Sequence, residues 1–293
     1  MPTCPAAPAD ELPSNSKHRI TGARVNCAPM RYLPLLIASF LAGCHSAPLF
    51  SPAPELTESK NASPRPPAGH AVELVYGKKA VGYRDFAGAK KVLPSVFAGM
   101  EEDFYCGCRY TGKAVDLAGC GYRPRKSFER ASRIEWEHVV PAWVLGQQRQ
   151  CWQSGGRGNC TATDPVFQVA EGDLNNLVPA VGEINGDRSN FAYSAWTRQP
   201  IPMYGSCQTI VDFKGKRVQP REDVRGRAAR ITLYMHETYK LTLSSQEKKL
   251  MCAWAKTYPV DDWERERNTR IVRWQGRGNP WVTEPAKLKA VCG

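Results

Sequence analysis

Cysteine content restricts the fold of this chain more than any other feature of its sequence. There are 11 cysteines among 293 residues, a count typical of proteins that fold in an oxidising compartment. Three of them, Cys4, Cys27 and Cys44, lie in the N-terminal segment. The other eight lie between residues 106 and 292, and an even number permits four disulfides whose pairing the sequence leaves open. We therefore expect an exported domain that disulfides stabilise.

The N-terminal segment carries an export signal. A single arginine follows Met30 and precedes the apolar run Leu33–Leu41, which is too short to remain in a bilayer as a spanning helix. This pattern is typical of a secretory signal peptide. Leu41–Cys44 also resembles the lipobox of bacterial lipoproteins, whose cysteine receives a lipid and becomes the mature N-terminus. We interpret residues 30–43 as a lipoprotein signal peptide; the alternative is an ordinary signal peptide in which Cys44 is incidental.

Composition divides the rest of the chain into three further segments. Residues 1–29 have no apolar periodicity, and we interpret them as an untranslated or disordered leader, with translation beginning at Met30. Residues 44–70 combine many prolines with serine and alanine, which predicts a disordered, solvated tether. Residues 71–293 contain no internal repeat and are predicted to form one mixed domain.

Helix and strand patterns are interspersed in residues 71–293, which predicts an α+β fold. The spacing of apolar residues predicts a helix over 85–104 that Pro94 interrupts. Residues 106–122 are rich in cysteine, glycine and aromatics and are predicted to be disulfide-linked strands or loops. Residues 133–140 are predicted to be a strand that ends before Pro141, and 147–164 a polar loop.

The C-terminal third is predicted to be mainly helical. A short strand is expected over residues 207–213, followed by a helix over 225–243. Ser244 and Glu247 have the spacing of a capping box, which predicts the start of a second helix that stops at Pro259. A third helix is expected to begin at Asp261.

Charge narrows the choice of partner. The hydrophobic fraction of 42% and the charged fraction of 23% exclude a disordered chain and a polytopic membrane protein. The net charge is +12. An excess of positive charge attracts nucleic acid or an anionic membrane. The helix predicted from residue 225 begins in a basic cluster that either contacts phosphates or forms a solvated face. Its members are Lys214, Lys216, Arg217, Arg221, Arg225, Arg227 and Arg230.

Four polar segments in the middle of the chain carry candidate chemistry: Glu135–Pro141, Gly155–Asn159, Glu171–Leu177 and Gly182–Asn190. Taken alone, each segment could have a purely structural role, such as a satisfied Glu–His pair or an Asn-Gly turn. Together they supply a base, an arginine for phosphate, and the carboxylate and amide oxygens that hard cations prefer. Those parts suit hydrolysis of a phosphodiester.

The same segments resemble the bacterial endonuclease I family in order and spacing, over about residues 71–292. The resemblance implies an endonuclease I-like catalytic domain with the ββα-metal core of the His-Me finger superfamily, extended by helices. It also implies a non-specific nuclease that is secreted or periplasmic. The matching segments are Glu137–Ala142, Gln148–Trp152, Asp173–Leu177, Gly182–Phe191, Met203–Gly205, Tyr258–Glu264 and Gly278–Pro280.

The resemblance also implies roles for individual residues. His138 is expected to be the general base, and Glu137 and Asn185 to hold one divalent cation, Mg²⁺ or another hard cation such as Ca²⁺ or Mn²⁺. Arg157 is expected to contact the scissile phosphate, and Glu171 to support the site. The expected reaction is cleavage of DNA, and of RNA, that ignores sequence and leaves 5′-phosphates.

Location and partners depart from the family in one respect. Members as a rule lack a lipobox, so a lipid on Cys44 would be an addition that anchors this chain. We expect a monomer in the periplasm or at the cell surface, attached to the outer membrane. One alternative is a lipoprotein that binds DNA without cutting it. Another is a zinc protein, suggested by Cys106-Gly107-Cys108, although export and an even number of cysteines favour disulfides.

One geometric difficulty accompanies these assignments. Neighbouring side chains on a regular strand point to opposite faces, so Glu137 and His138 are not expected to enter one site. A strand end or a bulge near Pro141 would bring them together. The alternative is that neither feature is present and that Glu135 is only an outward-facing partner.

Overall fold

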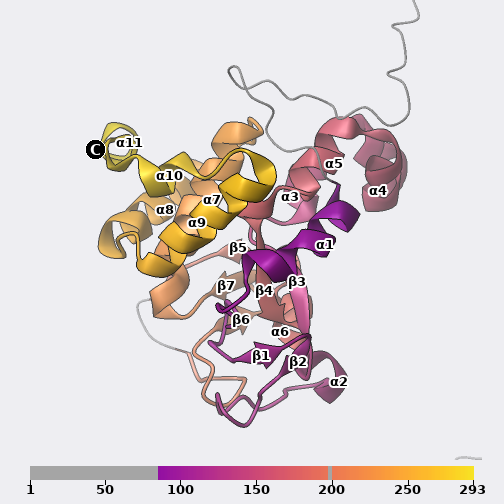
Figure 1. Cartoon of the computed structure of the whole chain (residues 1–293), viewed down its shortest axis with the longest axis vertical. Helices are drawn as coiled ribbons and strands as arrows, with labels where there is room; N and C mark the ends of the chain where they lie inside the picture. The colour runs from indigo at the N-terminus through magenta and orange to yellow at the C-terminus, as the bar shows by residue number, and fades with distance from the viewer. Residues whose placement is uncertain (1–84, 197–199) are drawn as a thin grey trace, which may run out of the picture. The chain divides into compact units, whose positions relative to one another are not determined.

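The computed structural model describes residues 85–196 and 200–293 (Figure 1). Helices and strands are mixed along this part of the chain, in agreement with the expected fold class. The predicted leader, signal peptide, lipid-carrying Cys44 and tether lie outside the described residues. Within the described ranges, no helix is long and apolar enough to cross a membrane.

The first helix, α1 (Phe86–Val96), is shorter than predicted. Asp85 caps it by accepting a hydrogen bond from the amide of Gly88 at 2.7 Å. Pro94 lies inside the helix without interrupting it, because a proline in the last turn removes only one hydrogen bond. The chain leaves the helix after Val96, so the prediction that it extends to residue 104 was wrong.

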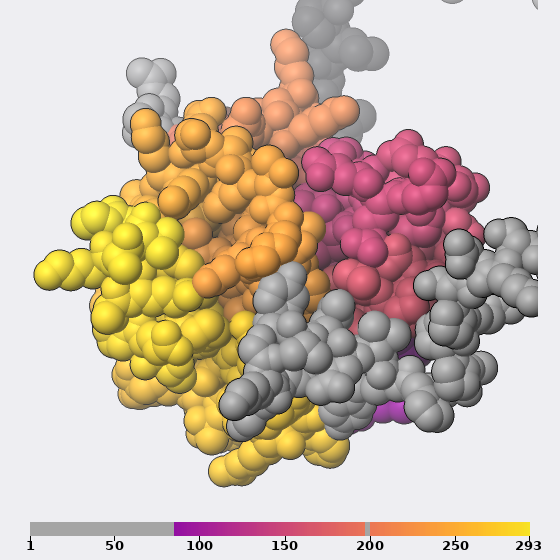
Figure 2. Space-filling model, turned by 90° about the horizontal axis from the view of Figure 1, so that it is seen from above, coloured from indigo at the N-terminus to yellow at the C-terminus, as the bar shows by residue number. Residues whose placement is uncertain are grey.

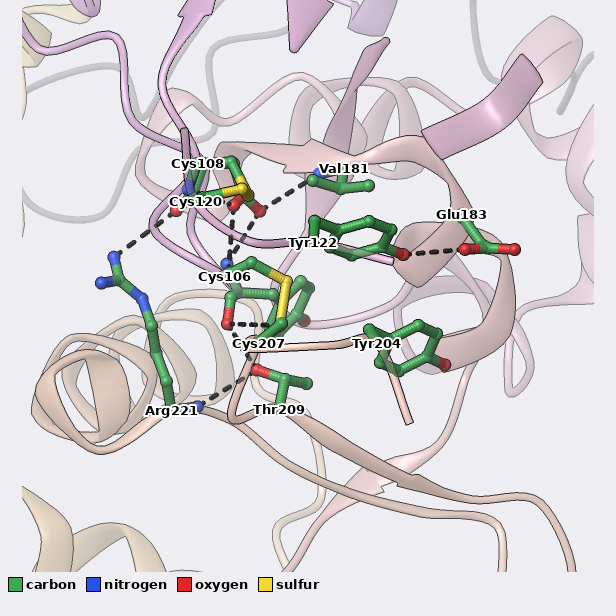
Figure 3. The surroundings of a disulfide bond; sticks show 12 residues. Cys106, Cys108, Cys120, Tyr122, Val181, Glu183, Tyr204, Cys207, Thr209 and Arg221 are labelled. Atoms are coloured by element: carbon green, nitrogen blue, oxygen red, sulfur yellow. Dashed lines mark hydrogen bonds between the residues drawn. A yellow bond between two sulfur atoms is a disulfide. The ribbon is translucent and has the colours of Figure 1, made fainter. Parts of the chain in front are cut away.

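Two disulfides organise the segment that follows α1. Cys108–Cys120 closes the hairpin of β1 (Tyr110–Thr111) and β2 (Ala114–Val115), and Cys106–Cys207 connects this segment to a distant part of the chain. Figure 3 shows both bonds side by side. The amides of the turn between them donate to the carboxylate of Asp103. That buried carboxylate accepts hydrogen bonds from the amides of Tyr105, Cys106, Cys108 and Val181. It thereby joins the disulfide-linked turn to the central strand pair.

The central strand pair positions the site. After the short helix α2 (Phe128–Ala131), β3 (Ile134–His138) pairs antiparallel with β4 (Leu177–Val181). The register is regular from one end to the other, with His138 opposite Leu177. The 3₁₀ turn η1 (Leu174–Asn176) precedes β4, and α6 (Gly182–Arg188) follows it directly, so that α6 packs against both strands. The predicted strand over 133–140 is confirmed.

Three helices cover the end of β3: α3 (Ala142–Gly146), α4 (Gln150–Thr163) and α5 (Pro165–Glu171). The prediction of a polar loop over residues 147–164 was wrong, since α4 occupies most of it. This helix has no apolar stripe for a sequence pattern to detect. It is held instead by the disulfide Cys151–Cys160 and by an ion pair between Arg149 and Asp164, whose nearest N–O distance is 2.6 Å.

The remaining strands form a small mixed sheet. Its order is β5–β7–β6, with β5 (Ala192–Tyr193) parallel and β6 (Ile210–Asp212) antiparallel to β7 (Arg217–Gln219). The predicted strand over 207–213 is therefore present but shorter than expected.

The C-terminal third is helical, as predicted, and Figure 2 shows its orange and yellow surface beside the rose surface of α3–α5. Ser244 and Glu247 form the expected capping box. The fourth disulfide, Cys252–Cys292, connects α8 to α11, so the prediction of four disulfides is confirmed. The elements are η2 (Glu222–Val224), α7 (Arg225–Thr238), α8 (Ser245–Thr257), α9 (Asp262–Gln275), α10 (Pro280–Thr283) and α11 (Pro285–Cys292).

Most of the predicted phosphate-binding cluster has a structural role instead. Arg230 is buried and pairs with Glu264, and it also donates to the carbonyl of Tyr258 at 2.8 Å. Arg227 pairs with Asp261. Arg221 pairs with two further carboxylates, and Arg225 donates to the carbonyl of Pro220. Only Lys214, Lys216 and Arg217 are exposed and have no such partner among the described residues.

The buried pair between Arg230 and Glu264 permits a stability prediction. Glu264→Gln is expected to lower the free energy of unfolding by about 3–5 kcal/mol, because it leaves a buried guanidinium without its counter-charge. The control is Glu266→Gln, since Glu266 pairs with Arg270 on the surface of the same helix and is half exposed. That variant is expected to lose less than about 1 kcal/mol. Chemical denaturation measures both; equal losses would show that burial adds nothing to this pair.

Candidate active site

A cleft of about 680 Å³ opens at the end of the central strand pair. Four of the five residues predicted for the site line it: Glu137 and His138 from β3, Asn185 from α6 and Arg157 from α4. The fifth, Glu171, is buried beneath and contacts two of them. Residues that are up to 48 positions apart in the sequence therefore converge on one cavity, with β3 and α6 as its base (Figure 1).

The imidazole of His138 is held on both sides. Its Nε2 lies 2.8 Å from the carbonyl oxygen of Glu171, and its ring packs on Phe86 with 4.6 Å between centroids. A carbonyl can only accept, so Nε2 carries the proton and Nδ1 is the unprotonated nitrogen of the neutral ring. Burial lowers the pKa of His138 to about 3, and the nearby cations Arg157 and Arg188 act in the same direction. The ring is therefore neutral at pH 7.

Glu137 is buried beside the imidazole and is paired with a buried arginine. Its Oε1 accepts a hydrogen bond from the hydroxyl of Tyr105 at 2.9 Å and lies 2.9 Å from Nη1 of Arg188. Burial raises the pKa of Glu137, and the charge of Arg188 opposes that rise. Arg188 also donates to the carbonyls of His138 and Val139, at 2.8 and 2.6 Å. One guanidinium thus fixes both the carboxylate and the backbone that carries the imidazole.

The side-chain amide of Asn185 is oriented by a neighbouring carboxylate. Its Nδ2 donates to Oε2 of Glu135 at 2.9 Å, which identifies the nitrogen end and leaves Oδ1 as the opposite end. Glu135 in turn pairs with Arg130 at 2.5 Å and with Arg133 at 3.6 Å. Glu135 has partners, as expected, but it also lines the cleft. The alternative in which Glu135 is only an outward-facing partner therefore does not hold.

The pairing of β3 with β4 explains how the neighbouring residues Glu137 and His138 reach one cleft. The register of β3 and β4 contains no bulge, so of the two alternatives the strand end accounts for the arrangement. His138 is the last residue of β3, and the backbone then turns into Pro141 and α3. The cleft extends around this end, and it receives Glu135 and Glu137 from one face and the imidazole from the terminus.

A break inside α4 presents Arg157. Gly155 and Gly156 have non-helical backbone angles, and Gly156 has a φ of 65°, which favours glycine. Arg157 follows directly, and its Nε donates to Oε1 of Glu171 at 2.6 Å. Its side chain is 48% exposed, and Nη1 and Nη2 donate no hydrogen bond to any described residue. Two parallel donors therefore remain for an anion in the cleft.

Comparison with known proteins identifies this arrangement. The sequence pattern of the family described as Endonuclease I matches residues 95–286. The chain belongs to the endonuclease I family. An extracellular deoxyribonuclease of Aeromonas hydrophila is 52% identical over 202 residues, which cover 67% of this chain and 87% of the relative. A periplasmic deoxyribonuclease of the same species is 51% identical over 202 residues, 67% of this chain and 84% of the relative.

A more distant relative extends the same match. Endonuclease-1 of Buchnera aphidicola is 43% identical over 211 residues, which cover 71% of this chain and 83% of the relative. Membership of the endonuclease I family makes this chain an endonuclease. The expected resemblance is thus confirmed.

The oxygen atoms in the endonuclease I cleft fit a hard cation. Among the described residues, no group of three or more His, Cys, Asp or Glu side chains is placed to hold a metal. Glu137 and Asn185 nevertheless offer one carboxylate and one amide oxygen, and Mg²⁺ is commonly held by few protein oxygens together with water and phosphate. Tyr105 and Arg188 both contact Oε1 of Glu137, so Oε2 has no side-chain partner among the described residues and faces a cation more readily.

Other carboxylates in the polar segments have structural roles. Asp173 is buried and accepts hydrogen bonds from Tyr234 and Tyr239, while Glu183 accepts from the amides of residues 125–127. Asp187 pairs with Arg125. Arg188, by contrast, was missed as a site residue. No sequence signal distinguishes it, because its role depends on burial between β3 and α6.

Proposed function

We propose that this endonuclease hydrolyses DNA, and RNA, without reading the base sequence, and that it does so with His138 as the base and one hard divalent cation. The observation that supports this most is the convergence of a neutral, oriented imidazole and two unpaired oxygen ends, those of Glu137 and Asn185, on one cleft. A protein that only binds DNA has no need of that combination.

The relatives support the choice of DNA and an exported location. Two of those reported above are named deoxyribonucleases, one extracellular and one periplasmic. We propose the same substrate here and an exported enzyme, and the expectation of a monomer stays part of this proposal. A lipid on Cys44, which would attach it to the outer membrane, is part of this proposal.

We also propose that β3, β4 and α6 form the ββα-metal core. The antiparallel pair β3–β4 carries His138 at one end, and α6 follows β4 without an intervening loop. Asn185 lies on that helix, and Glu137 lies on β3. This order of a base-bearing strand, a second strand and a ligand-bearing helix supports the assignment.

The proposed reaction begins with the imidazole. Nδ1 of His138 takes a proton from water as the water oxygen bonds to phosphorus, while Nε2 stays bonded to the carbonyl of Glu171. The bond between phosphorus and the 3′-oxygen breaks and the departing oxygen takes a proton from solvent water, so the products are a 5′-phosphate and a 3′-hydroxyl. The low pKa of His138 keeps the ring unprotonated before substrate binds. The negative charge of a bound phosphate raises that pKa toward the range of an effective base.

The other residues act on charge and position. Glu137 and Asn185 would hold Mg²⁺, or Ca²⁺ or Mn²⁺. When bound, that cation supplies positive charge to the phosphate oxygens and the leaving oxygen. Arg157 donates from Nη1 and Nη2 to a non-bridging oxygen while Glu171 fixes its Nε. None of these groups reads a base edge, which supports cleavage that depends weakly on sequence.

A plasmid-nicking assay tests the proposal. Supercoiled plasmid is expected to become nicked and then linear when Mg²⁺ is present, and excess chelator is expected to stop the reaction, because the oxygens of Glu137 and Asn185 then hold no cation. Renewed addition of Mg²⁺ should restore cleavage, which controls for unfolding by the chelator. Retention of plasmid without nicking in Mg²⁺ would favour the alternative, a DNA-binding protein without activity.

A further inference from the structure

A small apolar hollow continues the cleft on one side. Its volume is about 130 Å³, and it shares Pro141, Trp143, Arg188 and Asn190 with the cleft. Trp143 forms part of both walls and is 41% exposed. Most of the remaining lining is apolar and comes from the segment after β3, from α3 and from the start of α8; it includes Val139, Val140, Val144, Leu243 and Met251. Thr232 and His236 of α7 also line it. An exposed indole above an apolar hollow suits the flat face of an unpaired nucleobase.

A larger basic hollow of about 640 Å³ continues the apolar one. The two share Ala192, Tyr193 and Glu247, so the three cavities adjoin one another in a row, here called the depression, that starts at the cleft. Lys216, Arg217 and Lys249 line the basic hollow and are exposed. None of these three side chains forms an ion pair or hydrogen bond with a described residue, unlike the arginines of α7. These cations are therefore available to an anionic ligand.

One carboxylate lies at the junction of the two hollows. Glu247 is the N3 residue of the capping box of α8, where its Oε2 accepts from the hydroxyl of Ser244 at 2.6 Å and from its amide at 3.3 Å. Its charge is thus partly satisfied by the start of the helix. The basic hollow retains three cations against this one carboxylate.

We propose that a single strand of the substrate leaves the cleft along this depression. An unpaired base stacks on Trp143 over the apolar hollow, and the next phosphates bind Lys216, Arg217 and Lys249. This rests on the proposed function, since the strand enters from the catalytic cleft. The small size and apolar lining of the middle hollow suit one unpaired base and do not suit the charged backbone of a duplex. The depression therefore suits a single-stranded or locally opened segment of the substrate.

The chain offers a matched pair of variants for the test. Lys216→Ala/Lys249→Ala removes two charges from the depression. Lys214→Ala/Lys248→Ala removes two charges from the same turn and the same helix, but neither of those lysines lines the hollow. Both pairs are exposed and have no partner among the described residues, so neither double variant is expected to disturb folding.

Binding is measured separately from cleavage. A fluorescent single-stranded deoxyoligonucleotide of about 16 nucleotides is titrated with each protein in chelator over a series of salt concentrations. Each phosphate contact contributes about 0.7 to the slope of log affinity against log salt. The variant in the depression should change that slope by about 1.4, which weakens binding about 25-fold at about 0.1 M salt. The matched control should keep the wild-type slope, and a blunt duplex should bind both double variants alike.

The outcomes separate this inference from the proposed function. If the wild-type enzyme nicks plasmid but the two double variants bind single strands equally, the depression does not guide the strand, while the proposed function stands. A larger loss for the duplex than for the single strand would also overturn the inference. If the wild-type enzyme neither nicks plasmid nor binds the oligonucleotide, the proposed function is wrong, and this inference, which rests on it, is wrong as well.

Discussion

Replacement of His138 by alanine is expected to abolish detectable nicking, which corresponds to a loss of at least about 10²- to 10⁴-fold in rate. Among the described residues that line the cleft, His138 carries the only imidazole, so the variant loses the proposed acceptor for the proton of the attacking water. Binding of DNA should hardly change, because Arg157 and the exposed cations stay in place. The rate is measured by plasmid nicking and the affinity by titration in chelator.

Two controls make the His138→Ala result interpretable. The melting temperature should show that the variant is folded, since the ring also packs on Phe86. Added imidazole should restore part of the rate, because the substitution leaves a cavity of the right shape beside the carbonyl of Glu171. Near-normal turnover of a folded variant would show that another group is the base.

Glu137→Gln is expected to have the second-largest effect, and two causes must be separated. The substitution removes the negative charge of a proposed cation ligand, so cleavage at ordinary Mg²⁺ concentrations should fall at least about 100-fold. It also leaves Arg188 buried without its counter-charge, which should lower the free energy of unfolding by about 3–5 kcal/mol. Nicking and chemical denaturation are therefore measured on the same preparation.

A double variant distinguishes these two causes. Glu137→Gln/Arg188→Met removes both charges of the buried pair and should recover part of the lost stability, although the bonds to the carbonyls of His138 and Val139 are also lost. Its cleavage activity should remain as low as that of the single variant. Recovery of activity together with stability would mean that Glu137 serves only to balance Arg188.

The sequence located the residues that line the cleft better than it predicted the surrounding fold. The segments around Glu137, Asn185 and Arg157 were identified without coordinates, because short polar motifs keep their spacing whatever surrounds them. Helix α4 was missed, since a disulfide and an ion pair hold it and not an apolar stripe. The pairing of the four disulfides also required the fold, because Cys106 and Cys207 are 101 positions apart.

Long-range burial explains the other errors. The arginines at the start of α7 look like a phosphate-binding cluster in the sequence, yet Arg230 finds Glu264 34 residues later. The same limit concealed Arg188, whose partners lie about 50 residues earlier. Periodicity describes one element at a time, so it cannot show which charges meet inside the protein. The alternation rule also separated Glu137 from His138, because it ignores the shape of the cavity at a strand end.

The contact between the imidazole and position 171 has a consequence for mutational surveys. The ring is fastened to a main-chain oxygen, whereas the carboxylate of Glu171 is turned toward Arg157 and Thr161. A substitution of Glu171 that preserves the end of α5 keeps the main-chain carbonyl, so the tautomer of His138 does not change. It removes the carboxylate that holds Arg157. Under the proposed mechanism, a loss of activity at position 171 therefore reflects weaker binding of phosphate and not a change in the activation of water.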